Sequence, residues 1–173
     1  MHLKLISSGG MAKMGGYMPQ RLALSAEQPT GIVKLPAHLV APLFGALKIG
    51  VGDAATAIFV VLDEPDGLPS RLFVDANANG DLTDDPAPVW TARPVKGRDG
   101  ATYAQFSGSA KVSASLGGVQ AMLGLSMYRF DKRDPARAAM NGGDTGLIIA
   151  TAGLRGPALE KTIAAVLAKR LGR

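Results

Sequence analysis

The chain has 173 residues, of which 47% are hydrophobic and 19% are charged, a balance that excludes a wholly disordered chain and fits one ordinary domain. The absence of cysteine excludes disulfides, thiolate metal sites and thiol catalysis. The 22 glycines and 11 prolines favour short elements joined by turns over a bundle of long helices.

The formal net charge of +5 raises the question of a nucleic-acid or membrane partner. The densest basic segment, Arg129–Arg137, is interrupted by Asp131 and Asp134 and has few aromatic neighbours, so we interpret it as a solvated loop or the end of an element. We therefore expect no nucleic-acid partner. No apolar run approaches the ~20 residues of a membrane span, and the run at the N-terminus is too short for a signal peptide.

The first third of the chain predicts short elements. Weak alternation predicts a strand over His2–Ile6, and alternation of polar and apolar residues predicts another over Arg21–Ser25. The Pro36–Ala41 segment is compatible with one helical turn, which Pro42 would end.

The centre of the chain predicts three consecutive strands. Leu43–Ile49 alternates with period two, and Thr56–Leu62 is a continuous β-branched and aromatic run that is typical of a buried strand. Asp63–Pro69 has turn chemistry, and Arg71–Asp75 follows as the third strand. Because the connections are short, we expect an antiparallel meander.

Further strands are expected over Val89–Pro94, Thr102–Phe106 and Lys111–Leu116. The Gln120–Phe130 segment fits either a strand with a bulge at Gly124 or a helix, and we favour the strand.

The composition shifts after Met140, which suggests a β-rich domain over residues 1–140 and a strand–helix tail over residues 141–173 that packs on it. Leu147–Ala152 is the expected strand, and Pro157–Leu171 is an amphipathic helix whose apolar stripe would dock on the sheet. We therefore predict a mainly β (or α+β) fold, an antiparallel sheet or sandwich with a C-terminal amphipathic helix. The alternative is an α/β unit formed by the tail.

The loop Asp75–Pro86 carries the clearest chemistry, because its spacing D-x-N-x-N-G-D matches the first half of a calcium loop. Asp75, Asn77 and Asn79 supply short oxygen-bearing side chains at positions 1, 3 and 5. Gly80 at position 6 permits the sharp turn that brings those side chains together.

The second half of the loop departs from an EF-hand. Asp81 at position 7 would ligate through its main-chain carbonyl, and Pro86 replaces the bidentate Glu of position 12. We expect Asp84 or Asp85 to close the shell instead. With few ligating carboxylates, affinity should lie near roughly 10⁻⁴–10⁻³ M. The alternative is a surface loop rich in Asx turns that binds no ion.

Three segments, Gly15–Ser25, Leu43–Gly50 and Leu72–Pro86, together resemble a family of exported, β-rich bacterial modules of planctomycete type that carry an EF-hand-like calcium loop. Such modules sometimes stand beside a thioredoxin-like domain. The resemblance spans roughly Gly15–Phe130 and implies an extracytoplasmic accessory module.

Catalytic signals are weak. The two histidines, His2 and His38, lack the setting of a triad, and the carboxylates of Asp63, Glu64 and Asp66 lie in a turn that explains them without chemistry. We therefore hypothesise a non-enzymatic module in which Ca²⁺ stabilises a strand exit. The alternatives are a hydrolase that uses Asp and Glu carboxylates, or a module that binds a protein partner or neighbouring domain through an exposed strand edge.

Overall fold

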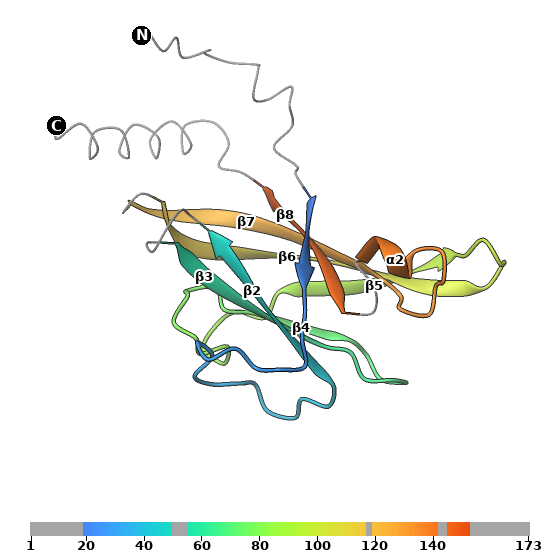
Figure 1. Ribbon diagram of the computed structural model, residues 1–173, viewed down its shortest axis with the longest axis horizontal. Helices are drawn as coiled ribbons and strands as arrows, with labels where there is room; N and C mark the ends of the chain where they lie inside the picture. Colours follow the sequence, from blue (N-terminus) through green and yellow to red (C-terminus); the bar gives the residue numbers. More distant parts are fainter. Residues whose placement is uncertain (1–18, 50–54, 117–118, 142–144, 153–173) are drawn as a thin grey trace, which may run out of the picture.

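The computed structural model describes residues 19–49, 55–116, 119–141 and 145–152 and shows a mainly β protein (Figure 1). A five-stranded sheet has the order β1-β8-β7-β6-β5, and a three-stranded sheet has the order β2-β3-β4. All neighbouring strands in both sheets are antiparallel. The elements are β1 (Pro19–Ala23), β2 (Pro42–Ile49), β3 (Thr56–Asp63), β4 (Arg71–Val74), β5 (Val89–Lys96), β6 (Thr102–Leu116), β7 (Val119–Phe130), α2 (Ala138–Asn141) and β8 (Gly146–Ala152).

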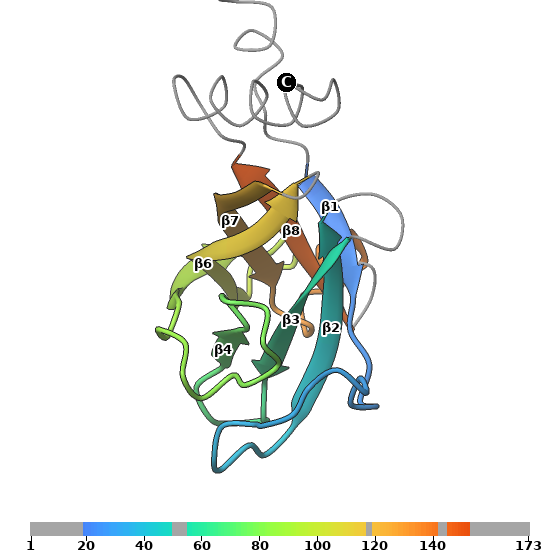
Figure 2. The same ribbon diagram turned by 90° about the vertical axis from the view of Figure 1, so that its left-hand side faces the viewer.

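The two sheets form the layers of a sandwich, with β6, β7 and β8 in one layer and β2, β3 and β4 in the other (Figure 2). Buried residues alternate with more exposed ones along β4 and β7, as the period of a pleated strand requires. The core between the sheets includes Ile58, Val60, Leu62, Leu72, Val74, Val112, Leu123, Leu125, Met127, Leu147 and Ile149.

A second, smaller core covers the other face of the three-stranded sheet. Ile32, Phe44, Val61 and Leu82 form it, and Leu82 comes from the Asp75–Pro86 loop. Strand β3 is therefore buried on both faces, which explains its continuous apolar run and confirms it as a buried strand.

The segment after β1 links the two layers. Ser25 exchanges two main-chain hydrogen bonds with Phe44 of β2, at 2.7 and 2.8 Å, directly after β1 has paired with β8. Leu24, between them, donates its N–H to the Thr145 carbonyl at 2.7 Å. The chain therefore closes one side of the sandwich.

The predicted meander is confirmed, because β2, β3 and β4 pair in chain order. Two expectations were wrong in detail. Thr102–Phe106 and Lys111–Leu116 belong to one 15-residue strand, β6, because the small residues between them continue the ladder with β7. Gly124 forms no bulge, since it pairs with Lys111 in an unbroken register, and the helical alternative for this segment is also wrong.

No helical turn forms over Pro36–Ala41. The Asp63 carboxylate accepts the N–H groups of Val40 and Ala41, at 3.0 and 2.7 Å, and so takes the donors that a helical turn would need.

At the other end of the described chain, Gly146–Ala152 is the expected strand, β8, and it lies antiparallel between β1 and β7. The expected strand His2–Ile6 and the expected helix Pro157–Leu171 lie outside the described residues, and the division at residue 140 stays a prediction. None of the described helices is long and apolar enough to cross a membrane.

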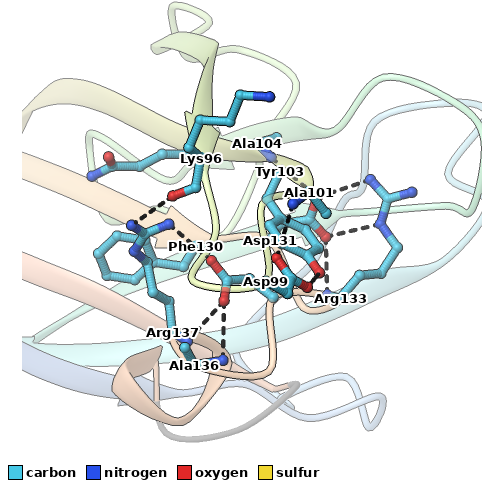
Figure 3. A network of polar contacts seen from close by, with 12 residues as sticks. Lys96, Asp99, Ala101, Tyr103, Ala104, Phe130, Asp131, Arg133, Ala136 and Arg137 are labelled. Carbon is cyan, nitrogen blue, oxygen red and sulfur yellow. Dashed lines mark hydrogen bonds and ion pairs between the residues drawn. The ribbon is translucent and has the colours of Figure 1, made fainter.

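The interpretation of Arg129–Arg137 as a solvated loop or the end of an element is confirmed in part, since β7 ends at Phe130 and a loop follows, but three of its charged residues are buried. Arg129 is fully buried on β7, and its guanidinium binds the Glu64 carboxylate, with Nη2–Oε2 at 2.7 Å. Asp131 and Asp134 are also buried, each beside an arginine. Figure 3 shows Arg133 against Asp131 and Arg137 reaching the main-chain carbonyl of Lys96, at 3.0 Å. Acids nearby in sequence neutralise Arg133 and Arg137, and Glu64, which follows β3, neutralises Arg129, so the segment is an ordered ion-paired corner.

Candidate metal centre

The loop Asp75–Pro86 follows β4 and is anchored to three parts of the fold. Asp75 donates its N–H to Phe59 of β3 at 2.9 Å, and Ser113 of β6 donates to the Ala76 carbonyl at 2.7 Å. Further along, Gly80 and Leu82 bind the main chain of the 33–34 segment. These anchors hold the loop against both sheets.

Asp75 places a buried carboxylate at the start of the loop. Its Oδ1 accepts the N–H of Asn79 and its Oδ2 that of Gly80, both at 3.1 Å. Burial raises the pKa of Asp75, and the nearby Asp84 carboxylate adds to the rise, while main-chain hydrogen bonds act against it. The loop therefore folds around a carboxylate whose charged form is disfavoured.

Asn77 and Asn79 converge on a second carboxylate, that of Asp84. The Nδ2 group of Asn79 donates to Oδ2 of Asp84 at 2.8 Å, and that of Asn77 donates to Oδ1 at 3.3 Å. The side-chain oxygen of Asn77 accepts the N–H of Asn79 at 3.0 Å, and that of Asn79 accepts the N–H of Asp81 at 2.7 Å. Each of these hydrogen bonds closes an Asx turn. Asp75, Asn77 and Asn79 thus all lie close to Asp84.

Asp85 supplies the one buried side-chain oxygen in the described part of the chain that has no hydrogen-bond partner, its Oδ2. Burial raises the pKa of Asp85, and the carboxylates of Asp75 and Asp84 raise it further, while main-chain hydrogen bonds from Ala76 and Asn77 lower it. A buried, unpaired carboxylate oxygen is costly and marks a place where a cation or a donor would be favourable.

The Asp81 side chain does not join this group. Its Oδ1 accepts the Thr83 N–H at 2.8 Å and the Thr83 hydroxyl at 2.5 Å, and its Oδ2 pairs with Lys34 at 3.3 Å. The Thr83 hydroxyl, followed by Lys34, holds the pKa of Asp81 below its ordinary value. Asp81 would therefore contribute only its main-chain carbonyl, as the sequence pattern predicts.

Gly80 is required at the turn for two reasons. Its φ is +82°, which side chains of L residues rarely adopt, and a Cβ there would overlap the Gly31 carbonyl oxygen. Its own carbonyl accepts the N–H groups of Val33 and Lys34, at 2.9 and 3.2 Å. The sharp turn and the contact with the 31–34 segment therefore depend on the same residue.

Five of the six predicted site residues thus gather by their side chains, namely Asp75, Asn77, Asn79, Asp84 and Asp85. Within the described ranges, no group of three or more His, Asp or Glu side chains is arranged to hold a metal by itself. A cation here would need the amide and main-chain oxygens of the loop as well, as calcium loops use them.

A groove of about 540 Å³ that sequence reasoning missed adjoins the loop. Its lining includes Lys34 and Leu35 from the segment before β2 and Asp85 and Pro86 from the loop. These two segments are distant in sequence, so only the folded chain brings them together.

The alternative acids have structural partners. Asp63 pairs with Arg71, Glu64 with Arg129, and the exposed Asp66 with Lys132 at 2.7 Å. In the fold these carboxylates neutralise arginine and lysine side chains.

Comparisons of the chain with protein-family models, with curated proteins and with solved structures find no match. The geometry of the loop is therefore the basis for a functional assignment.

Proposed function

We propose that the protein is a non-enzymatic β module in which the Asp75–Pro86 loop binds one Ca²⁺ ion and so stabilises the exit from β4. The observation that carries the proposal is the buried Asp85 Oδ2, which lacks a partner and lies near the carboxylates of Asp75 and Asp84. A hard cation would supply the missing partner and offset the repulsion among the three charges.

The exposure and hydrogen bonds of Asp84 and Asp85 also indicate which of the two completes the calcium coordination shell. Asp84 is exposed and already accepts two amide N–H groups, whereas Asp85 Oδ2 is buried and free of hydrogen bonds. We therefore assign the closing position to Asp85, together with the side chains of Asp75, Asn77 and Asn79 and the main-chain carbonyl of Asp81. The resemblance to exported modules supports an extracytoplasmic setting, where calcium is abundant enough for a weak site.

Calorimetric titration with calcium and thermal unfolding with and without EDTA test this proposal. A Kd of roughly 10⁻⁴–10⁻³ M is expected. Calcium at about ten to a hundred times Kd should stabilise the fold by about 1.4–2.7 kcal/mol.

Two variants separate ligation from general charge effects. Asp85→Asn should abolish the calcium-dependent stabilisation while raising ion-free stability, because the neutral amide removes a buried unpaired charge. Asp81→Asn, the matched control, should keep the calcium response, because its side chain faces Lys34 and Thr83. Unfolding that is independent of calcium in the unmodified chain would contradict the proposal.

A further inference from the structure

The chain contains two Asp–Pro peptide bonds, Asp85–Pro86 and Asp134–Pro135. Such bonds are chemically labile because the aspartate carboxylate can attack its own main-chain carbonyl carbon and close a five-membered anhydride. The proline nitrogen departs readily once it is protonated, because its high basicity favours proton uptake as the C–N bond breaks. An attacking carboxylate oxygen must first give up any hydrogen bonds that it accepts.

The two aspartates differ sharply in those hydrogen bonds. At Asp134, Oδ1 accepts the N–H groups of Ala136 and Arg137, at 3.0 and 3.2 Å, and Oδ2 accepts the Arg137 Nη1 donor at 2.9 Å. Both oxygens are therefore committed, in the corner that Figure 3 draws around Arg137. At Asp85, by contrast, Oδ2 is buried and accepts no hydrogen bond from any described residue. One uncommitted nucleophilic oxygen thus lies next to a scissile prolyl bond.

We propose that the Asp85–Pro86 bond is a self-cleavage site of this chain. The Asp85 Oδ2 forms a bond to the Asp85 main-chain carbonyl carbon, and the bond from that carbon to the Pro86 nitrogen breaks. A proton from solvent goes to the departing nitrogen. Water then opens the anhydride, which leaves a C-terminal Asp85 and an N-terminal Pro86, and no other reactant is needed.

The groove beside the loop supplies access for that water, because Asp85 and Pro86 both line it. The fold also determines the fate of the cleaved chain. The first fragment carries β1 to β4 and the second carries β5 to β8, yet β1 pairs with β8 and both fragments contribute to the central core. The nicked protein should therefore stay together under native conditions and separate only on denaturation.

This inference rests on the proposed function in one respect, the expected effect of calcium on the rate of cleavage. If Asp85 ligates Ca²⁺, its oxygen is occupied and calcium should slow the cleavage. Cleavage without calcium dependence would support the self-cleavage site and contradict ligation by Asp85, so the two proposals fail separately.

The test is incubation of the full chain at neutral pH with EDTA or with millimolar calcium, followed by intact mass measurement and N-terminal sequencing. In EDTA, cleavage at residue 85 should exceed cleavage at residue 134 by about tenfold to a hundredfold, because the attacking Asp85 Oδ2 accepts no hydrogen bond within the described chain. The product should run as one particle in native size-exclusion chromatography and as two bands on a denaturing gel.

Two variants should block the reaction. Pro86→Ala replaces the leaving group and retains the carboxylate, and Asp85→Glu forces a less favourable six-membered ring. Asp134→Glu is the matched control and should leave cleavage at residue 85 unchanged. The proposal is overturned if the EDTA sample stays intact, if both Asp–Pro bonds break at equal rates, or if Pro86→Ala cleaves as fast as the unmodified chain.

Discussion

The buried ion pair between Glu64 and Arg129 joins the two sheets, because Glu64 follows β3 and Arg129 lies on β7. The Arg129 side chain is fully buried, whereas 11% of the Glu64 side chain is exposed. Arg129 Nε and Nη2 bind both carboxylate oxygens at 2.7–3.1 Å, and Nη1 binds the Gly146 carbonyl. The unequal exposure predicts unequal costs for removing the two partners.

Glu64→Ala leaves a guanidinium in the interior without its counter-ion, so we expect the free energy of unfolding to fall by about 3–5 kcal/mol. Arg129→Met should cost less, about 1–3 kcal/mol, because Glu64 can turn toward the adjoining groove and water, although the Gly146 carbonyl loses a buried donor. The double variant should be no less stable than Glu64→Ala alone, since it contains no buried unpaired charge.

Urea denaturation followed by tryptophan fluorescence measures these differences. Trp90 is the single tryptophan, packs against the central core and stacks on Phe106 at 5.7 Å, so its emission reports loss of the sandwich. The reasoning is refuted if Arg129→Met costs as much as Glu64→Ala, or if the two losses simply add in the double variant.

Gly80→Ala should destabilise the protein by more than Gly100→Ala, because both residues have φ near +80° but only a Cβ at Gly80 meets backbone, the Gly31 carbonyl. The shared backbone cost is about 1–2 kcal/mol, and equal losses in urea denaturation would contradict the close approach. Asp131 has a pKa of about 2, chiefly through its hydrogen bond with Arg133. At a pH between that value and the ordinary pKa of aspartate, the unfolded state binds more protons than the folded state. Stability is therefore lost as the pH falls from about 4 to 2. Asp131→Asn should reduce stability at neutral pH by up to about 2 kcal/mol and flatten this acid limb, and an unchanged slope in pH-dependent unfolding would count against the assignment.

Period-two alternation and turn chemistry were sufficient to predict most strands in the described chain. The β2–β3–β4 meander and β8 are confirmed because their patterns follow local rules: alternating burial, short connections and continuous apolar runs. The length of β6 escaped prediction, since Gly108 and its small neighbours weaken the alternation although the ladder continues through them. The clustering of Asp75, Asn77 and Asn79 was predictable, because a tight turn at Gly80 depends on residues near in sequence.

By itself, the sequence determined the class of the fold, the position of the loop and its tight turn at Gly80. All of these follow from interactions over a few residues. The tertiary structure alone decided which acids are buried and which are paired. Glu64 pairs with Arg129 across the sandwich, Asp81 pairs with Lys34 from a distant segment, and Asp85 Oδ2 has no partner among the described residues. Partners distant in sequence determine the desolvation and neutralisation of each charge, and no local pattern encodes them.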